Sequence, residues 1–299
     1  MKASASPWQC VAQWRGHQRA VYDLACDAGG HIWSVGGDGL LVKWDRALSN
    51  WDATGEAMAR TDQALFSVAA VDDGMVAGGA SGGMVHRSDK GTEVLTGHEG
   101  GTFVFQGVLS AGADGRLRNW RTGEILAEVP GRIRCLLWDK DADSCKLGTH
   151  LGRIHDVKTG WILNVHEGSV RVLMPWPGKP AVATAGVDGR LKLWSTAEEP
   201  WTELLSIEAH KGAIYRAVAS PDGRWVATAS RDRSVAVWDA TTLELAARLH
   251  GPGMKGHTRS VNALLWADSA TLISGGDDRR ILVWRHDPDA GPETHGVRH

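Results

Sequence analysis

Short stretches of alternating apolar and polar residues recur along the chain, each centred on a tight turn. The clearest are IWSVGGDGLLVKW, VLSAGADGRLRNW, VATAGVDGRLKLW, VATASRDRSVAVW and LISGGDDRRILVW, which end at Trp44, Trp120, Trp194, Trp238 and Trp284. An alternation with a period of two is that of a β-strand, and turns such as Gly-Asp-Gly tolerate positive φ. Each stretch therefore predicts a β-hairpin.

Two weaker copies fill the gaps, MVAGGASGGMVHR ending at Arg87 and CKLGTHLGRIHD ending at Asp156. The seven repeats then end near residues 44, 87, 120, 156, 194, 238 and 284, with a mean spacing close to 40 residues. In most copies a histidine precedes the hairpin, with one alternating stretch after it and another before it. Four strands per repeat in seven repeats, without a long amphipathic helix, predict an all-β repeat protein.

Five copies carry the same polar residues at the same spacing. A serine or threonine stands four residues before an aspartate, a tryptophan six residues after it, and a histidine upstream. Because a buried aspartate is costly unless its oxygens accept hydrogen bonds, these residues are expected to form one structural framework per repeat. A histidine, hydroxyl and carboxylate that recur five times fit a scaffold better than a hydrolase site. The framework residues are His17, Ser34, Asp38 and Trp44; His98, Ser110, Asp114 and Trp120; His166, Thr184, Asp188 and Trp194; His210, Thr228, Asp232 and Trp238; and His257, Ser274, Asp278 and Trp284.

From residue 8 to about 284, this pattern resembles the WD-repeat β-propeller family. The resemblance implies a single seven-bladed propeller of four-stranded antiparallel blades around a central channel. It also implies that residues 8–14 form the outer strand of the last blade (258–284), closing the ring and covering an exposed edge. The propeller is thus expected over residues 1–284, followed by a polar, disordered tail at 285–299.

Copies two and four lack the framework pattern. Their matching positions hold Ala77, Ser81 and Arg87 in one, and Lys146, His150 and Asp156 in the other. These blades are expected to keep the backbone path, to lose the polar network, and to be the least stable part of the ring.

Composition narrows the function classes. The chain has 299 residues with 33 basic and 35 acidic side chains, so it has no general field for nucleic acid or anionic membranes. No apolar run reaches the roughly 20 residues of a membrane-spanning helix, and the start lacks the apolar segment of a secretory signal. The four cysteines have no CxxC spacing, which favours free thiols in a reducing cytoplasm. No metal or cofactor is expected.

The rarer aromatic residues share one position, just after the residue that opens the strand following each histidine. In proteins of the resembling family this position lies at the channel mouth and often contacts peptides. Arg132 and Arg231 are expected on the same face. The alternative is that these side chains only fill the rim. In order round the ring, the position holds Tyr22, Phe66, Phe103, Arg134, Arg171, Tyr215 and Asn262.

Three functions compete for such a ring. The favoured one is a non-catalytic adaptor that binds a protein or peptide segment at the channel mouth, with aromatic residues for an apolar anchor and arginines for an acidic or carboxylate group. The second is an enzyme or enzyme-accessory subunit with a site in the channel. Nucleic-acid binding ranks last, because no long basic stripe is present.

Two features leave questions open. Five histidines outside the framework are candidates for an enzyme site, but they fall on different predicted loops and strands: His31, His86, His150, His155 and His250. The insertion HGPGMK at residues 250–255 could overhang the channel as a lid or partner contact, or could be a tolerated surface insertion.

Overall fold

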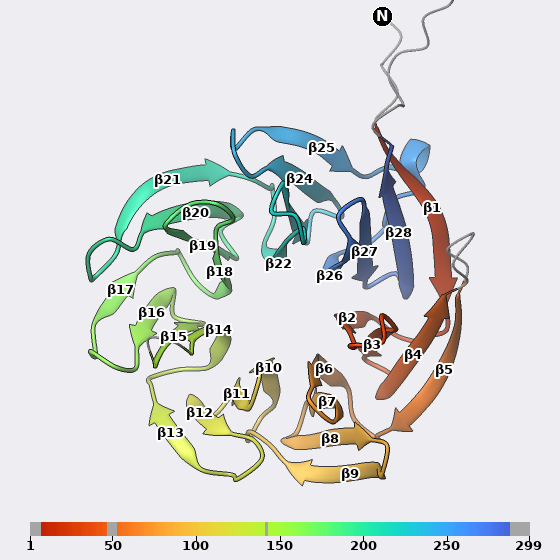
Figure 1. Ribbon diagram of the computed structural model, residues 1–299, viewed down its shortest axis with the longest axis horizontal. Coiled ribbons are helices and arrows are strands. Elements are labelled where there is room, and N and C mark those ends of the chain that lie inside the picture. The colour runs from red at the N-terminus through yellow and green to blue at the C-terminus, as the bar shows by residue number, and fades with distance from the viewer. Residues whose placement is uncertain (1–6, 47–52, 141–142, 288–299) are drawn as a thin grey trace, which may run out of the picture.

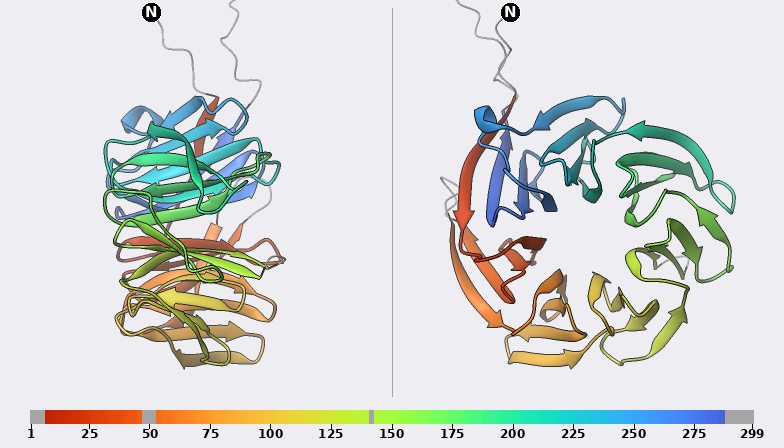
Figure 2. Two further views of the ribbon diagram at one scale, coloured as in Figure 1. Left: turned by 90° about the vertical axis from the view of Figure 1, so that its left-hand side faces the viewer. Right: turned by 180° about the vertical axis from the view of Figure 1, so that it is seen from behind.

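The computed structural model describes residues 7–46, 53–140 and 143–287. Its strands form seven four-stranded antiparallel sheets, which stand as blades around a central opening (Figure 1). The view from behind shows the same closed ring of strands (Figure 2). The predicted all-β, seven-bladed architecture is confirmed.

Six blades are built from four consecutive strands, and the first strand of each lies innermost (Figure 1). Blade 1 holds β2 (Val21–Cys26), β3 (Ile32–Gly36), β4 (Leu40–Arg46) and β5 (Ala53–Arg60). Blade 2 holds β6 (Leu65–Val71), β7 (Gly74–Gly79), β8 (Gly83–Ser88) and β9 (Gly91–Thr96). Blade 3 holds β10 (Thr102–Gln106), β11 (Leu109–Gly112), β12 (Arg116–Asn119) and β13 (Ile125–Glu128).

The second half of the ring repeats this order. Blade 4 holds β14 (Ile133–Asp139), β15 (Ser144–Thr149), β16 (Arg153–Asp156) and β17 (Ile162–Asn164). Blade 5 holds β18 (Val170–Pro175), β19 (Ala181–Gly186), β20 (Arg190–Ser195) and β21 (Thr202–Glu208). Blade 6 holds β22 (Ile214–Ala219), β23 (Trp225–Ser230), β24 (Val235–Asp239) and β25 (Leu245–Leu249). Blade 7 holds β26 (Val261–Asp268), β27 (Thr271–Gly276), β28 (Arg280–His286) and the N-terminal β1 (Trp8–Arg15).

The hydrophobic core lies between neighbouring blades. Every residue of β3, β19, β23 and β27 is buried, because these strands are covered on both faces by the adjoining sheets. One cluster joins Trp176 of blade 5 to Trp238 of blade 6. The outer strands alternate instead, as β1 does, where buried or half-buried residues take turns with exposed ones. Face-to-face stacking explains why the inner strands read as nearly continuous apolar runs.

The N-terminal strand closes the ring as predicted. β1 pairs antiparallel with β28, from Trp8 opposite His286 to Arg15 opposite Arg280. Trp8 and Trp14 are only 1% and 2% exposed, and the Trp14 ring stacks 5.6 Å from that of Trp44 in blade 1. Two strands from opposite ends of the sequence thus share one sheet, and β1 covers the edge that β28 would otherwise expose.

β28 continues to His286, two residues beyond the predicted end of the last repeat. Residues 288–299, where the disordered tail is predicted, lie outside the described residues. Within the described ranges the one helix is the short 3-10 turn η1 (Pro252–Met254), and none is long and apolar enough to cross a membrane.

The register predicted for copy four is wrong by one residue. Ile133 pairs with Thr149 just as Val21 pairs with Gly36, and the N–H of Val157 donates to the carbonyl of Cys145. The repeat therefore ends at Val157 instead of Asp156. Without a terminal tryptophan, the sequence lacks the landmark that marks this end in five other copies. The residues standing where blade 1 has Ser34, Asp38 and Trp44 are the apolar Leu147, Leu151 and Val157.

Blade 4 also keeps a polar cluster of its own. The Lys146 ammonium lies 3.2 Å from Asp156 and 3.2 Å from Glu199 of blade 5, and it donates to Ser144 at 2.6 Å. The expected loss of a polar network therefore applies to the framework and not to the blade as a whole. Its low stability stays a prediction.

Candidate functional site

Each framework is a chain of hydrogen bonds from a carboxylate to an indole. In blade 1, Nδ1 of His17 lies 2.9 Å from Asp38, Nε2 lies 2.7 Å from the Ser34 hydroxyl, and the Trp44 indole donates to that hydroxyl at 2.7 Å. Because the carboxylate only accepts, Nδ1 carries the proton, and Nε2 accepts the hydroxyl proton. The chain ties the loop before β2 to the turn after β3.

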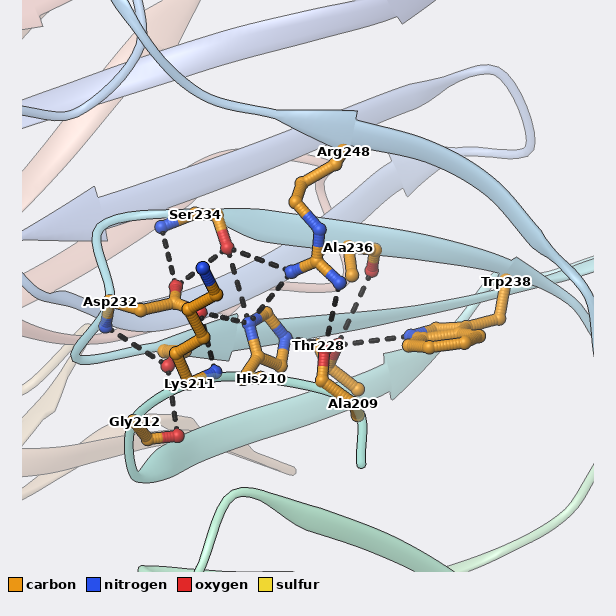
Figure 3. A network of polar contacts seen from close by, with 11 residues as sticks. Ala209, His210, Lys211, Gly212, Thr228, Asp232, Ser234, Ala236, Trp238 and Arg248 are labelled. Atoms are coloured by element: carbon orange, nitrogen blue, oxygen red, sulfur yellow. Dashed lines mark hydrogen bonds and ion pairs between the residues drawn. The ribbon is translucent and has the colours of Figure 1, made fainter. Parts of the chain in front are cut away.

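Four blades build this chain completely. Figure 3 shows it in blade 6, where His210 lies between Asp232 and Thr228, and the Trp238 indole donates to the Thr228 hydroxyl. Blades 5 and 7 repeat it with the following residues: His166, Thr184, Asp188 and Trp194; and His257, Ser274, Asp278 and Trp284.

Blade 3 departs at its tryptophan. His98 bonds Asp114 and Ser110, but the Trp120 indole donates to the Gly107 carbonyl at 2.9 Å instead of to the hydroxyl. β12 ends one residue before Trp120, whose ring packs into the cluster of blade 2. The expectation that Trp120 completes the framework is therefore wrong.

The framework carboxylates are held in the charged form. Burial alone would raise the pKa of Asp38, but the hydrogen bonds that it accepts from His17 and from the backbone keep it below its ordinary value. The same balance lowers the pKa of Asp114, Asp188, Asp232 and Asp278. These groups stabilise the loops at one end of the ring. We call that end, formed by the loops between blades and the turns between second and third strands, the framework face.

The seven predicted mouth residues line one cavity of 370 Å³ in the channel: Tyr22, Phe66, Phe103, Arg134, Arg171, Tyr215 and Asn262. Each is the second residue of an innermost strand, which explains why one position in the repeat reaches one place. Arg132 and Arg231 are exposed in loops of the same face and are not among the residues lining the cavity.

Three lining residues were not predicted: Asp23, Arg216 and Asp277. Asp23 and Arg216 directly follow mouth residues, at a β-bulge that turns two successive side chains towards the channel. Asp277 directly precedes the framework Asp278. A regular strand would point the side chains of Asp23 and Arg216 to the other face, so the alternation of the sequence did not predict them.

Aromatic rings form an arc along blades 1 to 3. The ring of Tyr22 lies 5.4 Å from that of Phe66, and Phe66 lies 5.7 Å from Phe103. The arc ends under Arg134, whose guanidinium lies 3.8 Å above the Phe103 ring. On the other side, the Arg171 guanidinium lies 5.5 Å over Tyr215. Ring faces attract cations, so both arginines are positioned by aromatic neighbours.

Neither of these arginines has a counterion within the part of the chain that the structure describes. The Nε atoms of Arg134 and Arg171 are both buried and have no hydrogen-bond partner there. Burial, together with the like charge of Arg171, lowers the pKa of Arg134 to about 9, and burial also lowers the pKa of Arg171. Half-buried guanidinium groups are normally paired with carboxylates or phosphates. The pair thus leaves an anion-binding capacity unused.

The carboxylates of the cavity are already engaged elsewhere. Asp23 accepts hydrogen bonds from the backbone of Leu24 and Val68, and it lies 3.4 Å from the Arg216 guanidinium. Burial raises the pKa of Asp23, and Arg216 opposes that rise. Asp277 accepts from the Asn262 amide at 2.7 Å. Blades 6, 7 and 1 therefore present satisfied polar groups, while blades 4 and 5 present unpaired cations.

The histidines outside the framework do not converge. His31 is in blade 1 beside Asp27, His86 is in blade 2 beside Asp73, and His150 accepts from the Arg132 backbone N–H. His155 lies within β16, and His250 follows β25. No group of three or more potential metal ligands occurs within the described residues.

Comparison with known proteins agrees with this architecture. Residues 8–45, 201–239 and 251–285 match the family described as "WD40: WD domain, G-beta repeat". The matched stretches correspond to blades that carry complete frameworks.

Protein HIR1 of Yarrowia lipolytica is 28% identical over 145 residues, which cover 36% of this chain and 14% of that protein. The Ribosome biogenesis protein WDR12 homolog of Chlamydomonas reinhardtii is 25% identical over 93% of this chain and 55% of its own length. The chain thus spans little more than half, or less, of these curated relatives.

Among solved structures, the WD40 β-propeller domain of Doa1 superimposes with a TM-score of 0.79. It covers 95% of this chain and 99% of that domain, at 18% sequence identity. This likeness concerns the fold alone. The repeat match, the seven four-stranded blades and the framework hydrogen bonds in five of them agree, and the chain belongs to the WD40-repeat β-propeller family.

Proposed function

We propose that the protein is a non-catalytic adaptor that binds a protein segment at the channel mouth, with a carboxylate of that segment seated on Arg134 and Arg171. WD40 propellers are typically protein-interaction scaffolds, which supports the general class. The carboxylate is the specific part of the proposal.

One observation carries it: two neighbouring guanidinium groups are half-buried without a counterion among the described residues. A guanidinium offers paired N–H donors that match the two oxygens of a carboxylate, and such charge-assisted bonds are stronger than neutral ones. A bound carboxylate would accept hydrogen bonds from the terminal guanidinium N–H groups and neutralise the repulsion between the two cations. A side-chain or C-terminal carboxylate meets the same need.

The aromatic arc supplies the second contact. Tyr22, Phe66 and Phe103 present ring faces and edges beside the arginines, where an apolar side chain of the same segment would be desolvated. Aromatic and arginine side chains carry much of the binding energy at protein interfaces. A cavity of 370 Å³ accommodates a few side chains rather than a folded domain.

The proposal places the protein in the cytoplasm. Its support is that all four cysteines are free thiols, two of them buried. Burial raises the pKa of Cys135 and that of Cys145 to about 12, so both thiols stay protonated and unreactive.

The experiment compares three purified baits in lysate of the source organism. They are the parent, the double variant Arg134→Met/Arg171→Met, and the double variant Lys90→Gln/Lys140→Gln, whose lysines lie in turns at the opposite face. Segments of any protein held by the parent are then synthesised with free and blocked carboxylates. The proposal requires that the first double variant loses the partner, that the second retains it, and that blocking one carboxylate abolishes binding. Equal capture by all three baits would move the interface away from the channel.

A further inference from the structure

In each blade, the turn between the second and third strands contains a residue with positive φ. Two blades have an unusual residue type at this position. Five blades use a glycine there: Gly39, Gly82, Gly115, Gly152 and Gly189. Blades 6 and 7 instead hold Arg233 at φ 76° and Arg279 at φ 66°. L-residues rarely adopt this conformation, since the Cβ approaches the backbone. Blades 6 and 7 therefore have an arginine at the turn position where the other five blades have glycine.

The loop that follows β25 differs at this turn from the equivalent loop of blade 5. In blade 5, a Cβ added to Gly189 would collide with the carbonyl oxygen of His210, because the loop from the outer strand crosses directly over the turn. In blade 6 this loop is longer, and Gly256 bonds back to Gly251 within the insertion itself. The Arg233 side chain and the insertion therefore belong to one local arrangement.

These arginines belong to a larger group of exposed cations on the framework face. The group lies in the loops of the contiguous blades 6, 7 and 1, and none of its members forms an ion pair with a described residue. The exposed acidic residues at the corresponding loops, Asp62, Glu99 and Glu167, belong to blades 2, 3 and 5. We call this group the cationic sector: Arg19, Lys211, Arg231, Arg233, Arg259 and Arg279.

A groove of 970 Å³ runs through the sector over blade 6. Lys211, Arg233 and His250 line it, and Gly251 and Gly256 of the insertion contribute to its wall.

The floor of the groove is held in place by Arg248. This side chain donates to the Ser234 hydroxyl at 3.1 Å and to the Ala209 carbonyl at 2.8 Å (Figure 3). The carboxylates of Asp188 and Asp232 in the groove are each bonded to a framework histidine, so Glu208 is the one lining acid outside such a pair.

We propose that an acidic polypeptide segment binds across the cationic sector and through this groove. The inference deepens the proposed function, on which it rests for the assumption that this face receives a protein partner. Uncompensated cations along a concave groove attract and orient a chain of carboxylates. A nucleic acid fits less well, because the loops of the sector contain no tyrosine, tryptophan or phenylalanine on which bases could stack.

The test uses a fluorescein-labelled peptide of twelve alternating glutamate and glycine residues with an amidated C-terminus, and measures its anisotropy with the full chain at low salt. The variant is Lys211→Gln/Arg233→Gly/Arg279→Gly, whose three side chains are exposed. The matched control is Lys90→Gln/Lys140→Gln/Lys179→Gln, which removes the same charge from turns at the opposite face. Exposed ionic contacts are weak individually, so three together are expected to account for a roughly tenfold change in affinity.

The proposal requires that the parent and the control bind within twofold of one another, that the sector variant binds roughly tenfold more weakly, and that added salt weakens binding. It is overturned if the parent does not bind, if the sector variant matches the control, or if a twelve-residue oligothymidylate binds more tightly than the peptide. The Arg134→Met/Arg171→Met variant separates the two proposals. If it retains the amidated peptide, the sector acts independently of the mouth. If it alone loses the peptide, the sector proposal fails while the channel proposal stands.

Discussion

Replacing Arg134 with methionine is expected to stabilise the fold while removing half of the proposed anion site. Methionine keeps the length of the side chain, is apolar, and can pack against the Phe103 ring. It removes a half-buried cation that has no counterion within the described chain and lies beside a second one, Arg171. Most substitutions of a half-buried residue lower the free energy of unfolding, so an increase would indicate that Arg134 is an unpaired buried charge.

The magnitude follows from the proton affinity of Arg134. Burial, together with the like charge of Arg171, lowers its pKa to about 9, and each tenfold change in proton affinity corresponds to about 1.4 kcal/mol, so the cost of the buried charge is at most about 5 kcal/mol. Solvent that reaches the channel would reduce this cost, and the contact of the guanidinium with the Phe103 ring offsets about 1–2 kcal/mol of it. We expect Arg134→Met to raise the free energy of unfolding by about 1–2 kcal/mol at pH 7.

The pH dependence has a definite sign. The folded-state pKa of Arg134 lies below the unfolded-state value, so the destabilising effect is fully present below about pH 9 and decreases as the pH rises towards the ordinary pKa of arginine. A measurement at pH 7 therefore captures the whole effect. Urea unfolding at pH 7 gives the free energy, and calorimetry should show a midpoint higher by roughly 2–4 °C.

Arg118 provides the matched control. Its side chain is also largely buried, but it lies 3.0 Å from Asp114, a framework carboxylate. Arg118→Met is expected to lower the free energy of unfolding by about 1–3 kcal/mol, because it takes a partner from a buried acceptor. If Arg134→Met destabilised the protein as much as Arg118→Met does, the claim that Arg134 lacks a counterion would be refuted.

Three further predictions concern the framework and the closure of the ring. Trp14→Ala should cost about 3–5 kcal/mol in urea unfolding, because it empties a site that is 2% exposed; a loss below about 1 kcal/mol would mean that the N-terminal strand does not hold the ring closed. Burial would raise the pKa of Asp232, but hydrogen bonds from His210 and Ser234 hold it below its ordinary value, so its stabilisation is present above about pH 4 and disappears as the pH falls through the folded-state pKa. Asp232→Asn should accordingly cost about 1–3 kcal/mol at pH 7. If the difference in the free energy of unfolding between the parent and this variant were as large at pH 3 as at pH 7, the account would be contradicted. Arg233→Gly should leave thermal stability unchanged or slightly raised, whereas Gly189→Arg should lower it by at least about 2 kcal/mol; equal effects would show that the two turns are not different.

Most of the fold was predictable because the repeat carries its own landmarks. A tryptophan such as Trp44 and an aspartate such as Asp38 mark the end and the turn of a hairpin, so five copies align without ambiguity. Copy four lacks both landmarks, and the predicted end of that repeat, Asp156, was one residue too early. A strand register is specified by side chains that must face a given side, and in copy four these are ordinary apolar residues.

The lining of the channel was predictable for one position of the repeat and not for its neighbours. Tyr215 and its equivalents follow from register alone. Arg216 enters the cavity because a bulge interrupts the alternation, and its ion pair with Asp23 of blade 1 crosses in front of blade 7, where the equivalent residue is the small Ala263. Pairings between blades depend on the closed ring, which a repeat-by-repeat comparison does not contain.

The central claim is that Arg134 and Arg171 hold a carboxylate of a partner. The most direct measurement is the affinity, by isothermal titration, of the captured partner segment for the parent and for Arg134→Met/Arg171→Met, with unfolding midpoints taken on the same samples. Two charge-assisted hydrogen-bonding groups are each worth about 1.5–3 kcal/mol, so the variant should bind at least roughly 100-fold more weakly while melting at the same or a higher temperature. An affinity within twofold of the parent would contradict the claim.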